Sequence, residues 1–408
     1  MQPSTYTIKL EKLTYGGDAM GRLPDGRAVF VPFGLPGEKV RIRLVMEKKN
    51  FAKAELLEVI KPSLERVEAK CKHFGECGGC HYQNLSYGSQ LAAKTEILRD
   101  QLQRIGKIEN PPVQPMVGCP DPWNYRNHVQ FHLTEDGKLG YVEAHGKSII
   151  PISECHLPNA TIDSIWPQLE FESGAPFERV SLRTGANDDL MLILESGELE
   201  APELELEAGI SVVHLTQEDA LVMAGEDYIL MQVLERGFRV SAGSFFQVNT
   251  VMAEKMVEHL LDRLPLPTKT ILDVYCGVGL FSAFLAPECE HLIGIEASPS
   301  ACEDFGVNLD EFDHVELYEG AAEDVIPHLE AEQAIVLLDP PRSGVDKRAL
   351  DGIRQLAPKV IAYVSCDPST LARDAARLIA GGYRLVDVTP FDLFPQTYHI
   401  ESIAIFEL

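Results

Sequence analysis

The sequence predicts an α/β protein of three domains, with a doubly wound parallel sheet in its C-terminal part. Short apolar runs separated by Gly and Pro turns fill residues 5–60, a pattern typical of a small β-barrel. Residues 111–235 are rich in strands, which indicates a mixed α+β domain. From about residue 250, strands and helices alternate, and this alternation is typical of parallel sheets with right-handed crossovers. We therefore expect domains at 1–62, 63–240 and 241–408.

The individual elements follow from local patterns. The runs "TYTIKLEKL", "RAVFVPF", "EKVRIRLVME" and "KAELLEVI" predict the strands of the barrel, and Pro62-Ser63 predicts a linker after it. Residues 86–106 have the periodicity of a helix. In the C-terminal part, "TILDVY", "HLIGIE", "AIVLLD" and "VIAYVS" predict strands, each followed by a helix, and "RLVDVTPF" and "SIAIFEL" predict two final strands.

The chain contains nine cysteines, and three of them fall within the stretch "CKHFGECGGC". Cys71, Cys77 and Cys80 form this group, and Cys155 in "SECHLP" is the candidate fourth ligand. Four sulfur ligands suit zinc or an iron–sulfur cluster. The five-residue gap departs from the paired C-x2-C spacing of zinc sites, and free thiols are the third possibility.

A glycine loop follows the first strand of the predicted parallel sheet. "LDVYCGVGLFS" places Asp273 on the strand, with Gly277 and Gly279 in the turn, where glycine allows a ligand to approach the backbone closely. Glu296 ends the next strand, 23 residues later, and a carboxylate there can bind two ribose hydroxyls. NAD and S-adenosylmethionine both fit this pattern.

Two further strands of the predicted sheet end in reactive groups. In "VLLDPPRSG", Asp339 precedes two prolines that cannot continue a strand, so its carboxylate should project into the ligand cleft. In "YVSCDPSTLA", Cys366 precedes Asp367, a candidate N-cap, and Pro368, a candidate first helical residue. Because a helix N-terminus favours a negative charge, we expect a reactive thiolate at Cys366. This arrangement indicates covalent catalysis beside a cofactor.

The stretches "GSFFQVN", "LDVYCGVG", "GIEAS", "LLDPPRSG", "VSCDPSTLARD" and "HIES" together resemble the S-adenosylmethionine-dependent RNA uridine C5-methyltransferases. They cover most of residues 243–408. The resemblance implies a class I, Rossmann-like methyltransferase domain. It implies that Cys366 adds to C6 of uracil and that Glu401 removes the C5 proton. It also implies cofactor contacts from Gln247, Tyr275, Glu296 and Asp339.

The N-terminal part has resemblances of its own. "YGGDAMGR" and "VFVPFGLPGEKVRIRL" resemble a TRAM domain, an OB-like barrel of RNA-modifying enzymes. The cysteine pattern resembles the iron–sulfur branch of the family, which implies a 4Fe–4S cluster on the four cysteines. This combination resembles the enzymes that act on 23S ribosomal RNA, and the T-loop of transfer RNA is the alternative substrate.

Candidate RNA contacts come from the barrel and from "WNYRNHVQFH". Basic side chains can bind the RNA backbone, and an aromatic ring can stack on a base. In the barrel we expect contacts from Lys48, Lys49, Phe51 and Lys53. The second stretch resembles a family segment near the RNA path, and there we expect a contact from Arg126.

The net charge of −26 is unfavourable for a nucleic-acid partner, but it is unevenly spread. Residues 1–70 carry a net charge of +4, whereas residues 161–235 carry −15. We expect a cytoplasmic monomer without membrane spans or a signal peptide. An iron–sulfur redox protein and a non-catalytic RNA-binding module are the alternatives from other functional classes. The presence of both Cys366 and Glu401 favours the enzyme.

Overall fold

The structure is a computed structural model and describes residues 4–197, 209–216, 220–329 and 335–408. The N-terminal strands form a closed barrel in the order β1-β2-β3-β5-β4, so the predicted barrel is confirmed. Along β4, Val40, Ile42 and Leu44 point into the barrel and alternate with exposed residues. The strands are β1 (Thr5–Leu13), β2 (Ala19–Arg22), β3 (Ala28–Val31), β4 (Lys39–Glu47) and β5 (Phe51–Lys61).

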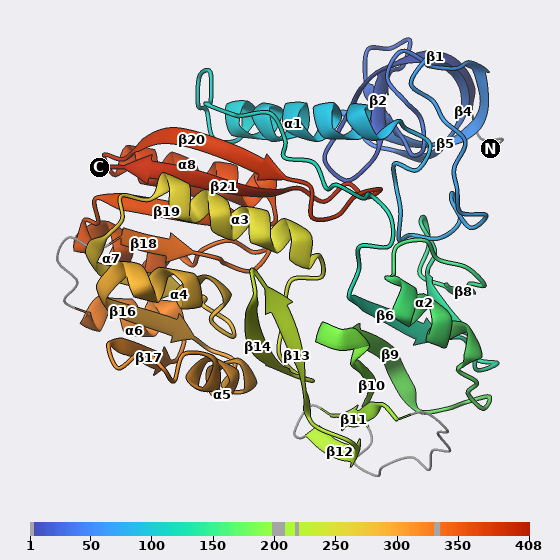
Figure 1. Ribbon diagram of the computed structural model, residues 1–408. Coiled ribbons are helices and arrows are strands. Elements are labelled where there is room, and N and C mark those ends of the chain that lie inside the picture. Colours follow the sequence, from blue (N-terminus) through green and yellow to red (C-terminus); the bar gives the residue numbers. More distant parts are fainter. Residues whose placement is uncertain (1–3, 198–208, 217–219, 330–334) are drawn as a thin grey trace.

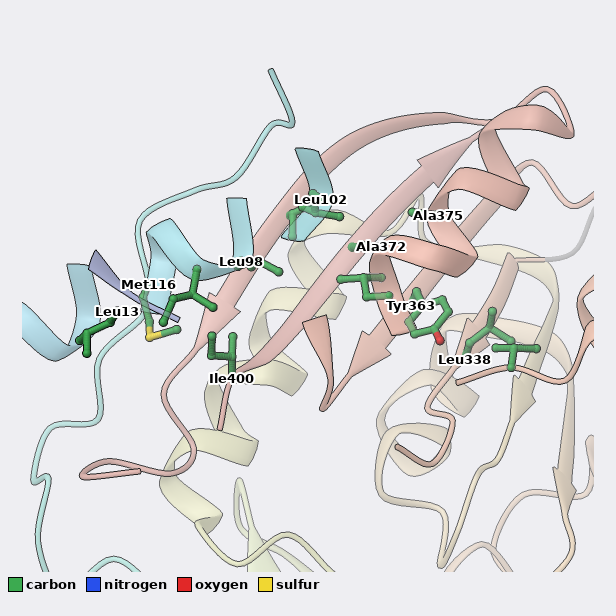
Figure 2. Close-up of a cluster of buried hydrophobic side chains, with 14 of the residues drawn as sticks. Leu13, Leu98, Leu102, Met116, Leu338, Tyr363, Ala372, Ala375 and Ile400 are labelled. Carbon is green, nitrogen blue, oxygen red and sulfur yellow. The ribbon is translucent and has the colours of Figure 1, made fainter. Parts of the chain in front are cut away.

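The helix predicted over 86–106 is α1 (Tyr87–Arg104). It runs from the barrel along the side of the C-terminal domain and packs on α8 (Pro368–Ala380) (Figure 1). Leu98 and Leu102 of α1 belong to one buried cluster with Leu13 of the barrel and Ala372 of α8 (Figure 2). The barrel and the C-terminal domain therefore share a continuous hydrophobic core.

The central domain contains a seven-stranded sheet in the order β12-β11-β10-β9-β6-β7-β8. Its core includes Phe131, whose ring packs against Tyr141 and Trp166. The strands are β6 (His128–Leu133), β7 (Leu139–Val142), β8 (Ile149–Pro151), β9 (Phe177–Thr184), β10 (Leu190–Ser196), β11 (Ser211–Leu215) and β12 (Ala220–Ala224), and the helix is α2 (Ala160–Ile165). A separate hairpin of β13 (Tyr228–Val233) and β14 (Arg236–Ser241) leads into the C-terminal domain.

The C-terminal sheet has the order β17-β16-β15-β18-β19-β21-β20 and is parallel except for β21. Strands β18 and β19 are buried along their whole length, as expected when helices cover both faces. The strands are β15 (Thr268–Val274), β16 (Cys289–Glu296), β17 (Val315–Glu319), β18 (Ile335–Leu338), β19 (Val360–Ser365), β20 (Arg384–Phe391) and β21 (Glu401–Glu407). The remaining helices are α3 (Thr250–Arg263), α4 (Leu280–Leu285), α5 (Pro299–Asn308), α6 (Ala322–Val325) and α7 (Lys347–Leu356).

This strand order confirms the doubly wound fold. In chain order, β16 and β17 extend the sheet on one side of β15, and β18 and β19 then extend it on the other side. Ligands of such sheets bind where the order reverses, outside the carboxyl ends of the strands. Within the described residues, no helix is long and apolar enough to span a membrane.

Candidate active site

The glycine loop after β15 has the backbone that a close ligand approach requires. Tyr275, Gly277 and Gly279 all have positive φ, at +66°, +54° and +87°. A Cβ atom on Gly279 would lie 2.3 Å from Leu309 Cδ1, so glycine is needed at this position. The loop therefore turns sharply under the carboxyl end of β15 and leaves its backbone open to a ligand.

Glu296, at the end of β16, is held against this loop. Its carboxylate accepts hydrogen bonds from the backbone N–H of Gly277 at 2.9 Å and from those of Ala297 and Ser298 at 2.8 Å each. These bonds orient the carboxylate at the strand end, beside Tyr275. Two of the four predicted cofactor contacts, Tyr275 and Glu296, thus lie together.

Buried and half-buried carboxylates lie at the same strand ends. Burial raises the pKa of Asp273 to about 7, and the nearby charge of Glu296 adds to this shift. Burial also raises the pKa of Asp339 to about 7, with further contributions from the charges of Asp273 and Glu296. A cationic ligand would relieve this repulsion, so the site suits the sulfonium and ammonium groups of S-adenosylmethionine.

Gln247, the fourth predicted cofactor contact, lies in the loop between β14 and α3. It is buried, and its backbone carbonyl accepts a 3.0 Å hydrogen bond from the Asn127 side chain. Asn249 caps α3 two residues later by accepting from Met252 N–H. The loop is therefore held in place from both the central and the C-terminal domain.

Cys366 and Glu401 lie at the same end of the sheet as Asp339, where the parallel strands have their carboxyl ends. Cys366 follows the last residue of β19, and Glu401 is the first residue of the antiparallel strand β21. Ser365 pairs with Ser402 across this ladder, so Cys366 and Glu401 occupy the next facing positions. The tertiary structure thus brings together the two residues predicted to perform the chemistry.

The expectation of a stabilised thiolate at Cys366 was wrong for the protein without ligands. Burial raises the pKa of Cys366 to about 12, and the charges of Glu401 and Asp339 raise it further, whereas Arg342 opposes them. Burial likewise raises the pKa of Glu401 well above its usual range, and Asp339 contributes to the shift. Burial is the largest cause of the raised pKa of Cys366, and the neighbouring carboxylates add to it.

The local structure around Cys366 agrees with the sequence in other respects. Asp367 is the N-cap of α8, because its Oδ1 accepts from the N–H groups of Ser369 at 2.8 Å and Thr370 at 3.0 Å. Its other oxygen, Oδ2, accepts a 2.9 Å hydrogen bond from the hydroxyl of Tyr15 in the barrel. The sequence contained no signal for this contact, since the two residues are 352 positions apart.

The four predicted ligand cysteines line one cavity of about 240 Å³. Burial raises the pKa of Cys80 to about 12 and that of Cys155 to about 11. The described residues contain no group of three or more Cys, His, Asp or Glu side chains placed to hold a metal ion. Zinc would draw four sulfurs to about 2.3 Å from one ion, whereas a four-iron cluster needs sulfurs spaced around a larger body. The shared cavity is compatible with the cluster, which stays a prediction.

Arg126 lies beside this cavity and not on an open RNA-facing surface. It is half-buried, and its guanidinium lies over the rings of Tyr125 and Phe394, at 5.8 and 5.7 Å from their centroids. Its Nε is buried and has no hydrogen-bond partner in the part of the chain that the structure describes. The predicted RNA contact therefore finds no support in this placement, whereas a cation beside four cysteines would suit an anionic cluster.

The predicted RNA contacts of the barrel fall into two groups. Lys48 and Lys49 form the exposed turn between β4 and β5, where Lys48 N–H donates to the carbonyl of Phe51 at 2.8 Å. Phe51 and Lys53 instead line a groove between the barrel and α1. The groove also contains residues that the sequence did not single out, among them Tyr15.

Comparison with known proteins matches both ends of the chain to described families and its whole length to RNA methyltransferases. The family described as tRNA (Uracil-5-)-methyltransferase matches residues 198–407, and the TRAM domain family matches residues 1–57. An uncharacterized RNA methyltransferase of Halalkalibacterium halodurans is 34% identical over 442 residues, covering 98% of this chain and 96% of the relative. An uncharacterized RNA methyltransferase of Aquifex aeolicus is also 34% identical, over the full length of both chains.

Among solved structures, the Pyrococcus abyssi tRNA (uracil-54, C5)-methyltransferase in complex with S-adenosyl-L-homocysteine has the same fold. Its TM-score is 0.76 at 24% identity, covering 98% of this chain and all of that one. Because both the sequence families and the full-length relatives agree, the chain belongs to the tRNA (uracil-5-)-methyltransferase family and is an S-adenosylmethionine-dependent RNA (uracil-5-)-methyltransferase.

Proposed function

We propose that this enzyme methylates C5 of a uridine in structured RNA through a covalent bond between Cys366 and C6 of the uracil. The observation that carries the proposal is the facing position of Cys366 and Glu401 across β19 and β21, beside Asp339. A nucleophile, a base and the acidic cofactor pocket then meet at one edge of the sheet.

The residue types match the chemistry. C5 of uracil is a poor nucleophile, and addition of the Cys366 thiolate to C6 opens the C5–C6 double bond and makes C5 enolate-like. S-adenosylmethionine would supply an electrophilic methyl group to C5, with its sulfur–methyl bond broken and S-adenosylhomocysteine as the leaving group. Glu401 then accepts the C5 proton, and the released electron pair re-forms the double bond and expels the Cys366 thiolate. The target base must leave the stack to reach this site.

The thiolate must form in the loaded enzyme, because the pKa of Cys366 is raised to about 12 without ligands. A cationic cofactor beside Asp339 would hold that carboxylate ionised and offset its repulsion of the thiolate. Glu296 would bind the ribose hydroxyls, and Tyr275 and Gln247 would complete the proposed cofactor contacts. Arg342 adds a positive charge that lowers the pKa values of both Cys366 and Glu401.

Two tests address the reaction. Labelled S-adenosylmethionine should transfer its methyl group to total RNA, and digestion should yield 5-methyluridine. Cys366→Ala should abolish transfer while S-adenosylhomocysteine binding is retained. Methylation at another atom, or transfer by Cys366→Ala at the wild-type rate, would refute the covalent route.

For the substrate, we propose 23S ribosomal RNA, on the resemblance of the barrel and the cysteine pattern. The T-loop of transfer RNA is the second candidate, because the Pyrococcus abyssi protein of the same fold is named for uracil 54 of tRNA. Mass mapping of 5-methyluridine in both RNAs from a deletion strain decides between them: the site that loses its methyl group is the substrate.

We further propose that Cys71, Cys77, Cys80 and Cys155 hold a 4Fe–4S cluster in the central domain. Their shared cavity, the adjacent Arg126 cation and the spacing of the first three cysteines support this assignment. When bound, the cluster would join the segment around Cys71–Cys80 to the loop that carries Cys155.

A further inference from the structure

A groove of about 540 Å³ lies between the outer face of the barrel and α1. Its barrel wall is a row of neighbouring residues on four strands. Lys12 pairs with Met20, Met20 pairs with Phe30, and Phe30 pairs with Lys53. Side chains of residues that pair directly point to the same face of a sheet, so these four form one continuous surface.

The groove is basic, although the whole chain carries a net charge of −26. Lys12, Arg22, Lys53 and Arg104 line it, with Asp18 as the one acidic residue of the lining. Lys12 and Arg104 share Asp100 of α1 as a partner, at 2.7 and 2.8 Å. Lys53 is exposed and forms no ion pair within 4 Å among the described residues; the nearest acidic influence in the lining is Asp18, whose pKa the charge of Lys53 lowers, against the larger effect of burial.

Aromatic rings lie among these cations. Phe30 and Phe51 are half-buried and pack edge to face, with 6.0 Å between their centroids. Tyr15 and Met20 extend the apolar part of the lining. Aromatic rings interleaved with basic side chains are the usual means of binding single-stranded nucleic acid, because bases stack on the rings while phosphates contact the cations.

One end of the groove reaches the residue beside the nucleophile. Tyr15, in the groove lining, donates its hydroxyl hydrogen to Asp367 Oδ2 at 2.9 Å. Asp367 follows Cys366 directly and caps α8. A ligand at this end of the groove would therefore lie close to the residue that follows the proposed nucleophile.

We propose that this groove binds a single-stranded nucleotide flanking the target uridine, with its base against Phe51 and its phosphate beside Lys53. The inference rests on the proposed function, since it assigns a subsite to the same RNA. A strand with one base flipped into the Cys366 site must continue past it, and this groove offers that continuation a basic and aromatic surface.

The test uses RNA oligonucleotides that contain the mapped uridine and carry an abasic residue at one flanking position at a time. At one position the abasic residue should lower kcat/KM of the wild-type enzyme about tenfold, as expected for one lost stack. In Phe51→Ala the same abasic residue should have almost no further effect, because the stacking partner is already absent. Tyr6→Ala, which removes a barrel aromatic outside the groove, should behave as the wild type does.

In the contrary outcome, Phe51→Ala and the abasic residue lower kcat/KM independently at every position, so that the two fold-losses multiply. That result would refute the inference. Phe51→Leu, which keeps most of the apolar volume but lacks the ring, repeats the test if Phe51→Ala does not fold. Equilibrium binding of the same oligonucleotides to Cys366→Ala separates the two proposals. If the losses of binding affinity caused by Phe51→Ala and by the abasic residue do not multiply, the groove is upheld. If the wild type at the same time methylates none of these oligonucleotides, the proposed reaction is refuted.

Discussion

The Cys366 thiol lies in a site whose electrostatics oppose its ionisation until the ligands are bound. Burial and the charges of Glu401 and Asp339 raise its pKa to about 12, and the charge of Arg342 acts in the other direction. A thiol held neutral in the free enzyme is protected from oxidation, because the thiolate is the reactive form. Reactivity then depends on what the cofactor and the RNA change in this pocket.

The raised pKa of Cys366 predicts the pH dependence of the reaction. Because the thiolate fraction of the free enzyme rises with pH below the raised pKa, kcat/KM should increase from pH 6 to pH 9. Arg342→Gln removes the charge that lowers this pKa, so the curve of kcat/KM against pH for this variant should be displaced to higher pH. The exposed Arg348→Gln on α7 is the control and should superimpose on the wild type. Identical profiles for Arg342→Gln and the wild type would contradict the assignment.

Glu401 and Cys366 should be separable by the step that each performs. Glu401→Gln keeps the shape but removes the base, which typically costs roughly 10²–10⁴ in rate. Because the methylated adduct cannot lose its C5 proton, the enzyme should stay bonded to RNA and appear as a shifted, methyl-labelled band on a denaturing gel. Wild-type enzyme with 5-fluorouridine RNA should give the same band, and Cys366→Ala should give none. Full turnover by Glu401→Gln would exclude it as the base.

At the scale of elements, the loop between β20 and β21 is held by α1. Lys94 of α1 is fully buried and binds Asp392 at 2.6 Å and the Phe394 carbonyl at 3.0 Å. Gln90 of the same helix donates to the side chain of Gln396 at 3.0 Å. Since this loop leads directly into Glu401, α1 positions the proposed base from a distant part of the chain.

Breaking the buried ion pair should be costly. Lys94→Met leaves Asp392 charged and buried, so it should lower the free energy of unfolding by about 3–5 kcal/mol. The double variant Lys94→Met/Asp392→Leu removes both charges and should recover most of that stability. Urea denaturation monitored by circular dichroism measures both effects. A double variant less stable than Lys94→Met would contradict this explanation.

The cysteine cavity makes a separate prediction for the central domain. Anaerobically purified protein should be brown and contain iron and sulfide, and Cys77→Ser should lose the colour and destabilise the N-terminal half. Cys289→Ser, at a half-buried cysteine outside the cavity, should keep both metal and colour. Stoichiometric zinc without iron would contradict the cluster.

At the scale of the whole molecule, the domains are joined by packing and differ in charge. The barrel shares a buried cluster with α1 and the C-terminal sheet, so deleting the barrel would also expose the core around Leu98 and Leu102 (Figure 2). Residues 1–70 carry a net +4, although the chain as a whole is strongly acidic. RNA binding should therefore depend on the barrel side of the molecule.

Single charge substitutions test this dependence without disturbing the shared core. Lys53→Ala should reduce the slope of log affinity against log salt concentration by about 0.7, because one phosphate contact to a single strand is lost. Lys269→Ala, at an exposed lysine in the second position of β15, should leave the slope unchanged. An unchanged slope for Lys53→Ala would mean that this lysine does not contact phosphate.

The sequence by itself determined the barrel, the doubly wound sheet, the glycine loop, the N-cap at Asp367 and the candidate nucleophile and base. These features are encoded locally, in the spacing of apolar residues, turns and short motifs. Only the tertiary structure decided the pKa of Cys366, the position of Arg126, the Lys94–Asp392 pair and the groove ending at Tyr15. Each of these depends on burial and on charges brought together from distant segments, such as Lys94 and Asp392, which are 298 residues apart. Periodicity along the chain carries no information about such distances, because the neighbours of a side chain are set by how the elements pack.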